Sequence, residues 1–381
     1  MKKIYWRPRA ISRPALALIA LISLGGMCLV EHWPAVQQRP FYDEKLAAAA
    51  RAAQGMEQIC YARLRASIPI DAENDPTESG LIGVRMSPVT TLVGDLNAKQ
   101  TSINPNFAAV VVDMLKRVGV KENDVVAVGC SGSFPALNLA AYAALETLKV
   151  KPIVILSAGA SQFGANLPEL LWLDMERILN EAGIISFHSV AVSYGGQGDR
   201  AEGMSQEGKK LIDAAVRRNP VPLLKADTYE RSLEQRMELY RKHAGHKPIR
   251  AYINVGAGTV SVGRAMGKRM FRPGLNLRPP ARVRHVDGVM PRFIRQGVPV
   301  IHLDEVRTLA EKYDLPLAPT SLPEVGQGTI YVGRTYHKGL AGGVLAGILA
   351  ALYLFIRSDI GFRLLRAGSR RKEAGHPEPM V

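Results

Sequence analysis

The sequence predicts an α/β domain with a mostly parallel, Rossmann-like sheet that carries helices on both faces. Two observations support this fold class. Short apolar runs alternate with longer segments of helical periodicity, and four of the runs end in loops rich in glycine and serine. This alternation is typical of parallel strands joined by crossover helices. We expect two transmembrane helices to flank the domain.

The centre of the sheet is expected at residues 125–128, an apolar run too short for a helix. Gly129 ends the run, and apolar residues then recur at helical spacing over residues 137–148. Ser133 is expected to cap that helix, and Pro135 fits its first turn because amides there lack intrahelical partners. A strand–turn–helix unit of this kind directs backbone N–H groups at a ligand above the strand end.

The remaining elements continue the alternation. Helices are expected at 42–67, 105–118, 168–182, 205–218, 228–243 and from a cap at Asp304 to 313, and strands at 152–156, 184–192, 251–255 and 298–303. The Gly/Ser loops lie at 129–133, 157–164, 193–198 and 256–263. Because the carboxyl ends of parallel strands meet at one edge of a sheet, these loops are expected to form a single ligand-binding edge.

Two apolar segments near the chain ends are about long enough to cross a bilayer. The first 13 residues carry a charge of +5 and residues 357–381 carry +3, so the positive-inside rule places both termini in the cytoplasm. The predicted order is a cytoplasmic tail 1–13, a transmembrane helix 14–32, an extracytoplasmic domain 33–336, a transmembrane helix 337–356 and a cytoplasmic tail 357–381. A cleaved signal peptide ending near Ser23-Leu24-Gly25 is the alternative for the first segment. Either way the domain faces the periplasmic side of the cell (inner) membrane.

Cysteine usage excludes a disulfide scaffold, since the chain has only three, at positions 28, 60 and 130. Cys60 and Cys130 either pair with each other or remain free thiols. The Cys and His spacing predicts no metal site, and the glycines after residue 255 do not form a dinucleotide fingerprint, so no cofactor is expected.

Positive charge is concentrated in one part of the predicted domain. The chain carries +15, and residues 264–295 hold nine basic residues against a single acid, which is +8. Arg278, Arg282 and Arg284 stand at the centre of this stretch, and guanidinium groups suit carboxylates through paired hydrogen bonds. The stretch indicates contact with a polyanion, with anionic lipid, or simply with solvent. Nucleic acid is not an expected partner because the domain lies outside the cytoplasm.

The loop Gly129-Cys-Ser-Gly-Ser133 partly matches a nucleophile elbow, in which Ser131 attacks a carbonyl and the amide of Gly132 holds the oxyanion. Its spacing does not select the base. Lys99 is one candidate, as a Ser–Lys dyad with Ser131 or Ser133. The others are a histidine with an orienting acid, drawn from His188, His285, His302, Asp199 and Asp304.

The repeated Gly/Ser loops favour a second interpretation, an anion-binding cradle. Its expected members are Gly129, Gly132, Ser157 and Ser161 together with the arginines at 278, 282 and 284. A third interpretation is that the first loop only closes a tight strand–helix connection.

Three stretches resemble the bacterial poly-gamma-glutamate system protein family. They are the run from Glu78-Ser-Gly-Leu-Ile-Gly through Ser87-Pro-Val-Thr-Thr to Ala98-Lys-Gln-Thr-Ser-Ile-Asn-Pro-Asn-Phe, the block Gly129-Cys-Ser-Gly-Ser-Phe-Pro-Ala-Leu-Asn, and Ser157-Ala-Gly-Ala-Ser-Gln-Phe-Gly-Ala-Asn. The resemblance covers most of the predicted domain and implies a role beside the machinery that makes and exports poly-gamma-glutamate. It supplies no catalytic residues.

Three functions therefore follow from the sequence. The first is a membrane-anchored accessory component of a poly-gamma-glutamate synthesis and export system, whose domain binds the polymer, another polycarboxylate, or the synthase. The second is a serine-dependent amide hydrolase or transferase that acts on the polymer. The third is a structural subunit that packs other membrane proteins of the complex through its two spans in the lipid bilayer.

Overall fold

The computed structural model describes residues 13–357. Residues 1–12 and 358–381 lie outside the described part of the chain, and with them most of the two predicted cytoplasmic tails. The chain divides into two compact units. One comprises residues 38–331 and the other combines the two ends of the chain.

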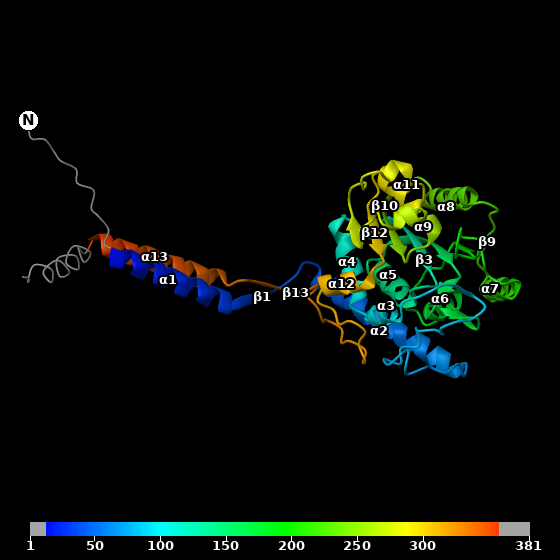
Figure 1. Ribbon diagram of the computed structural model, residues 1–381, viewed down its shortest axis with the longest axis horizontal. Helices are drawn as coiled ribbons and strands as arrows, with labels where there is room; N and C mark the ends of the chain where they lie inside the picture. Colours follow the sequence, from blue (N-terminus) through cyan, green and yellow to red (C-terminus); the bar gives the residue numbers. More distant parts are fainter. Residues whose placement is uncertain (1–12, 358–381) are drawn as a thin grey trace, which may run out of the picture. The chain divides into compact units, whose positions relative to one another are not determined.

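The larger unit is built on a seven-stranded sheet with the strand order β11-β12-β10-β3-β4-β8-β9. Figure 1 labels β12, β10, β3 and β9 of this sheet. Its strands are β3 (Val125–Ser131), β4 (Lys151–Ser157), β8 (Ala191–Ser193), β9 (Leu223–Leu224), β10 (Ile249–Val255), β11 (Gly274–Asn276) and β12 (Val300–Leu303). All neighbouring pairs are parallel except β11 and β12. A mostly parallel sheet is thereby confirmed.

Helices cover both faces of this sheet, as predicted. One face carries α2 (Tyr42–Arg65), α4 (Phe107–Arg117), α5 (Pro135–Thr147), α6 (Trp172–Glu181), α7 (Gln206–Arg218) and α12 (Val306–Lys312), and the other carries α8 (Tyr229–Ala244), α9 (Thr259–Val262) and α11 (Val289–Arg295). Alternate residues of β3 supply the two cores: Val126 and Val128 face the first set of helices, and Val125 and Ala127 face the second. Strand β3 is buried along its whole length because both faces are covered.

Shorter elements complete the unit. They are α3 (Leu96–Ser102), α10 (Arg264–Lys268), the 3₁₀ turn η1 (Val283–His285), and the two-stranded ladders β2 (Thr90–Leu92) with β5 (Ala160–Ser161) and β6 (Asn166–Leu167) with β7 (Leu170–Leu171). None of these short elements was predicted from the sequence, nor were β9, β11, α9 and α11.

Two predicted elements are shorter than expected. The helix predicted at 168–182 begins only at Trp172, because residues before it form the β6–β7 ladder and the carboxylate of Asp174 accepts the amide of Leu171. The strand predicted at 184–192 is reduced to β8. In the segment before β8, the amide and hydroxyl of Ser186 donate to the Glu146 carboxylate instead, and those of Ser189 donate to the Glu176 carboxylate.

Neither predicted helix cap is observed. The N-cap of α5 is Phe134, and Ser133 Oγ instead accepts the amide of Ser161 at 3.1 Å. Helix α12 begins after Glu305, which has a φ of 48° and makes no capping hydrogen bond, and Asp304 stands before it. Ser133 therefore makes a tertiary hydrogen bond in place of a capping one. Asp304 does not cap α12.

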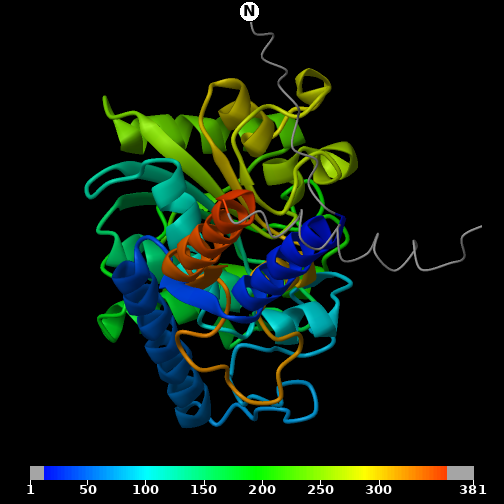
Figure 2. The ribbon, with the colours of Figure 1, turned by 90° about the vertical axis from the view of Figure 1, so that its left-hand side faces the viewer.

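The smaller unit contains α1 (Arg13–His32), β1 (Pro34–Gln38), β13 (Val332–Tyr336) and α13 (Lys338–Arg357). The two strands pair, and Figures 1 and 2 show α1 and α13 side by side. Gly26 permits this approach, since a side chain there would collide with Val344. Small residues allow close contact between apolar helices in this way.

Among the described residues, only α13 is long and apolar enough to cross a membrane, over Lys338–Phe355. The apolar part of α1, Leu16–His32, is shorter than the roughly 20 residues that a span requires. The prediction of two transmembrane helices is therefore supported for the second segment alone.

Candidate functional site

A pocket of about 460 Å³ lies at the carboxyl edge of the parallel sheet. Each of the four Gly/Ser loops contributes to its lining, with Ser131 and Ser133 from the first, Ser157 and Ser161 from the second, Gly196 from the third, and Gly258 and Ser261 from the last. The prediction that these loops gather at one edge is confirmed. The remaining lining residues include Lys99 from α3, Arg236 from α8, Lys268 from α10, and Asp304 and Glu305 from the loop before α12.

Lys99 is the central cation of this pocket. Its side chain is only 2 % exposed, and Nζ donates to Ser161 Oγ at 2.8 Å and to the carbonyl oxygen of Ser133. Nζ also stands over the ring of Phe134, 3.7 Å from its centroid. No carboxylate of the described chain lies within ion-pair distance of Nζ. A buried lysine whose polar partners are a hydroxyl and a carbonyl is unusual, because burial of an unpaired charge is costly.

Burial lowers the pKa of Lys99 to about 7, while the carboxylates of Asp304 and Asp95 act in the opposite direction. A large fraction of Lys99 is therefore neutral near pH 7. A neutral amine at 2.8 Å from a hydroxyl can accept its proton, so Lys99 and Ser161 have the geometry of a base and a nucleophile.

Backbone amides lie next to this pair at the start of α5. Ser133 Oγ accepts the amide of Ser161, which holds the two serines together. The amides of Ser133 and Phe134 donate to no acceptor within residues 13–357. Free amides at the N-terminus of a 13-residue helix are suited to an oxyanion.

Ser131, the serine of the predicted elbow, has no base in the described structure. Its Oγ donates to the carbonyl oxygen of Val255 at 3.4 Å, and its carbonyl oxygen accepts Asn138 Nδ2 at 2.8 Å. Gly129 and Gly132 do not line the pocket. The hydroxyl of Tyr252 occupies the place that a side chain at Gly129 would need, which is a structural role.

None of the predicted histidine bases hydrogen-bonds Ser131 in the described structure. His188 and His285 are exposed, on the loop before β8 and on η1. His302 is buried on β12, where burial lowers its pKa; its Nδ1 lies 3.1 Å from Asn254 Nδ2 and its Nε2 lies 3.9 Å from Asp304. Asp199 is bound by Arg236. The structure thus favours Lys99 over every histidine as the base.

Arg236 and Asp199 form a buried ion pair that lines the pocket with Ser157. Arg236 is 2 % exposed, and its Nε and Nη2 donate to the Asp199 carboxylate at 2.9–3.0 Å. Nη2 also donates to Ser193 Oγ at 2.7 Å and to Ser157 Oγ at 3.1 Å. Arg236 was not predicted from the sequence as a site residue. The available signal was an arginine at helical spacing from Leu233 and Tyr240, on the apolar face of the predicted helix 228–243.

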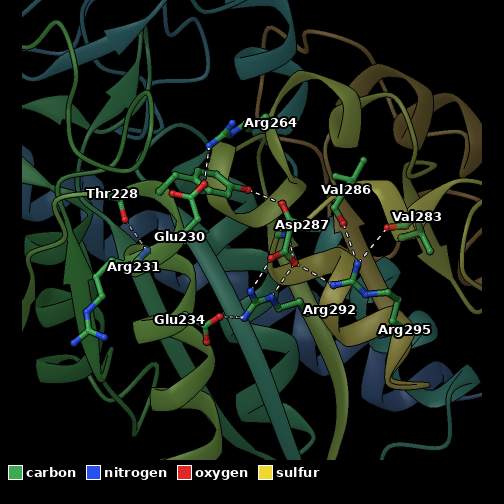
Figure 3. Close-up of polar contacts among 12 residues, drawn as sticks. Thr228, Glu230, Arg231, Glu234, Arg264, Val283, Val286, Asp287, Arg292 and Arg295 are labelled. Atoms are coloured by element: carbon green, nitrogen blue, oxygen red, sulfur yellow. Dashed lines mark hydrogen bonds and ion pairs between the residues drawn. The ribbon is translucent and has the colours of Figure 1, made fainter.

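Several of the arginines in the basic stretch 264–295 form ion pairs with carboxylates of this chain. Arg292 donates to both oxygens of Asp287 at 2.9 and 2.6 Å and to Glu234 at 2.7 Å, and Arg295 donates to Asp287 at 3.0 Å (Figure 3). Hydrogen bonds from Arg292 hold the pKa of Asp287 below its usual range. Arg264 pairs with Glu230 in the same way at 3.2 Å. Acids of α8, distant in sequence, therefore neutralise part of the predicted excess charge.

Arg278, Arg282 and Arg284 are exposed, and no ion pair within residues 13–357 engages them. Arg284 lines a separate, shallow pocket of about 600 Å³ with His285, Asp287, Arg292 and Arg295. None of the three lines the Lys99 pocket. The structure thus separates the predicted arginines from the predicted serines, and the anion cradle is not one site.

The cysteines are free thiols, and within the described residues no group of three His, Cys, Asp or Glu side chains is arranged to hold a metal ion. Cys130 is buried on β3, and Cys60 Sγ donates to the carbonyl oxygen of Glu78 at 3.2 Å. The alternative of a Cys60–Cys130 disulfide is therefore not observed.

Comparison with family models, curated proteins and solved structures gave no match for this chain.

Proposed function

We propose that this protein is a serine-dependent amide hydrolase or transferase, with Ser161 as the nucleophile and Lys99 as the general base. The observation that carries the proposal is the 2.8 Å contact between Lys99 Nζ and Ser161 Oγ, in a pocket at the carboxyl edge of a parallel sheet. The sequence predicts Lys99 as a base only for Ser131 or Ser133.

The proposed reaction proceeds in two halves. Neutral Lys99 accepts the hydroxyl proton of Ser161 while Oγ forms a bond to the amide carbonyl carbon, and the amides of Ser133 and Phe134 hold the resulting oxyanion. The Lys99 ammonium then gives its proton to the leaving nitrogen as the C–N bond breaks, which leaves an ester on Ser161. Water or an acceptor amine attacks that ester while Lys99 accepts its proton. Lys99 then returns the proton to Ser161 Oγ as the ester C–O bond breaks, so that hydrolysis or transfer results.

A second candidate function is a membrane-anchored accessory role in poly-gamma-glutamate synthesis and export. Its support is the resemblance of the three sequence stretches and the three exposed, unpaired arginines Arg278, Arg282 and Arg284. We place the larger unit outside the cytoplasm of a cell (inner) membrane, with α13 and α1 as a hairpin in the bilayer and both termini cytoplasmic. The partners would be the polymer or another polycarboxylate and the other membrane subunits of the complex. The two functions are compatible, since an enzyme of this kind would act on the polymer.

The catalytic proposal is tested on the full chain in detergent with a fluorophosphonate probe, which reacts with activated serines whatever the natural substrate. Labelling should map to Ser161 by peptide mass spectrometry and should be lost in Ser161→Ala and Lys99→Met. Ser131→Ala is the matched control and should retain labelling. Label on Ser131, or label that persists without Lys99, would overturn the assignment.

The accessory role is tested by the binding of poly-gamma-glutamate to the same preparation. Arg278→Glu, Arg282→Glu and Arg284→Glu together should weaken binding strongly and reduce its salt dependence. Lys121→Glu with Lys149→Glu and Lys151→Glu, three exposed lysines elsewhere on the unit, makes the same change in net charge and serves as the control. Equal binding by both variants would show that the arginine stretch is not a polymer contact.

A further inference from the structure

The buried carboxylate of Asp199 connects its own loop, which follows β8, to three other elements of the larger unit. Arg236 of α8 donates to this carboxylate through Nε and Nη2 at 2.9–3.0 Å, and Ser232 of the same helix donates at 2.5 Å. Ser193 at the end of β8 donates at 2.6 Å, and Ser157 at the end of β4 donates at 3.3 Å. We call these five residues the Asp199 clamp.

The clamp holds a strained loop in place. Asp199 has a φ of 65°, in the left-handed region that residues other than glycine rarely adopt. Gly195, Gly196 and Gly198 also have positive φ, and glycines give the rest of the loop wide conformational freedom. Backbone strain of this kind persists only where surrounding contacts determine it, and it is typical of functional sites. The side-chain contacts that hold Asp199 in this conformation are those of the clamp.

The clamp lies at the start of the segment that carries the proposed nucleophile. Ser157 ends β4, and the chain continues directly from it to Ser161. Between these two serines, the amides of Ala158 and Gly159 donate to carbonyl oxygens at the end of β8, each at 2.9 Å. Beyond them, the amide of Ser161 donates to Ser133 Oγ at 3.1 Å. Segment 157–161 is therefore fixed at its start by the clamp, and a shift of the clamp would displace Ser161.

A buried ion pair such as Arg236–Asp199 is weak evidence for stability. Both charges must be desolvated before their attraction acts, so replacement of both members by neutral residues is often tolerated. What the pair supplies is geometry, because the planar guanidinium fixes the direction of every hydrogen bond that it donates. The proposed reaction needs such precision, since Lys99 Nζ and Ser161 Oγ must stay within hydrogen-bond distance.

We propose, on the basis of the nucleophile assigned above, that Arg236 and Asp199 are positioning residues for Ser161. Neither side chain hydrogen-bonds Ser161 or Lys99 in the described structure. The pair acts instead through Ser157, whose Oγ accepts Arg236 Nη2 at 3.1 Å, and through the end of β8. Without the pair, the pocket keeps its base and its nucleophile, but the distance between them is no longer fixed.

The first test measures amide hydrogen exchange by mass spectrometry on the full chain in detergent, so that no turnover is required. Arg236→Met with Asp199→Asn removes both charges together, and asparagine tolerates the positive φ at position 199. Exchange in peptides that cover residues 157–161 should become about tenfold faster or more. Unchanged exchange in these peptides would overturn the proposal.

Two controls accompany this measurement. Exchange in β10, the neighbour of β3 in the sheet, should not change, which separates a local effect from a general loss of stability. Arg218→Met with Asp174→Asn makes the same substitutions in an Arg–Asp pair outside the pocket, and segment 157–161 should then exchange at the wild-type rate. Equal acceleration by both pairs of substitutions would overturn the assignment to Arg236 and Asp199.

The second test measures the rate of fluorophosphonate labelling of Ser161 as a function of pH. The Arg236→Met, Asp199→Asn variant should be labelled about tenfold more slowly or less at every pH. Its inflection should remain near pH 7, since the carboxylates that act on the pKa of Lys99 are those of Asp304 and Asp95. Loss of that inflection would show that Lys99 has left its buried environment, and the pair would then have a structural role only.

Ser157→Ala removes the hydroxyl that links Arg236 to segment 157–161 and keeps the ion pair, so it decides the question if the double variant does not fold. Its labelling should be several-fold slower at an unchanged melting temperature, and a wild-type rate of labelling and exchange would overturn the proposal. If wild-type Ser161 is not labelled but exchange in the segment still responds to the double variant, the catalytic proposal fails and the clamp assignment stands.

Discussion

Lys99 Nζ lies 2.8 Å from Ser161 Oγ, although 62 residues separate the two in sequence. Lys99 comes from the short helix α3 and Ser161 from the short strand β5. Strand β5 pairs with β2, which precedes α3 in the chain, so the ladder brings the two residues together. This contact decides which of the pocket serines has a base.

The reactivity of Ser161 should increase with pH through about 7. Below its pKa of about 7, Lys99 is an ammonium group and cannot accept the serine proton. The measurement is the rate of fluorophosphonate labelling between pH 5 and 9. Asp304→Asn should move the inflection to lower pH, because the Asp304 carboxylate raises the pKa of Lys99. A flat profile would show that Lys99 is not the base.

Lys99→Met should abolish labelling without lowering the melting temperature. The pKa of Lys99 falls from the ordinary 10.5 to about 7 on folding, so the unfolded chain binds more protons between these values and wild-type stability rises with pH over that window. Below pH 7 the folded protein carries a buried charge that methionine removes. Thermal melts should therefore show the largest stabilisation by Lys99→Met below pH 7. A lower melting temperature at every pH would instead assign Lys99 a structural role.

Glu176→Gln should make the fold less sensitive to alkaline pH. Glu176 is fully buried on α6, and burial raises its pKa against the hydrogen bonds that Ser189 and Tyr142 donate. Above the ordinary pKa of a glutamate the unfolded chain loses this proton before the folded one does, so wild-type stability falls as pH rises through the folded pKa. Melting temperatures at pH 5 and pH 8 test this effect. The difference in melting temperature between pH 5 and pH 8 should be smaller in Glu176→Gln than in the wild type. An unchanged difference would contradict the prediction.

Arg292→Ala should destabilise the larger unit by about 1–2 kcal/mol, because it removes paired hydrogen bonds to Asp287 and one to Glu234. Arg284→Ala should leave stability unchanged, since no ion pair in the described chain uses it. Chemical unfolding of both variants provides the comparison. Equal stability of the two would show that the Asp287 contacts are not structural.

Much of the fold was predictable from local pattern. Four runs of β-type residues, followed by Gly/Ser loops and helical periodicity, indicated the parallel sheet and the edge at which the pocket lies. Errors arose where tertiary contacts replaced local ones. Ser133 binds the amide of Ser161 rather than capping α5, and residues 184–190 bind Glu146 and Glu176 rather than extending β8.

The site was predictable in its position and only partly in its members. Lys99, Ser133, Ser157 and Ser161 were named from the sequence, and all of them line the pocket. Their pairing was not predictable, because a Lys–Ser contact across 62 residues depends on strand pairing. Arg236 was not predicted as a site residue, because in a sequence a buried arginine within a helix cannot be told from one that faces solvent.

The strand–turn–helix unit at residues 125–147 was determined by the sequence alone. Pro135 begins the helix as expected, whereas the strand continues past Gly129 to Ser131, three residues beyond its predicted end, because β3 pairs with β4 up to that residue. Only the tertiary structure decided what that unit does. It left Ser131 without a base, placed Lys99 on Ser161, and paired Arg236 with Asp199 inside the pocket. Backbone preference acts between neighbours in sequence, whereas burial, pKa and the pairing of charges depend on residues that only folding brings together.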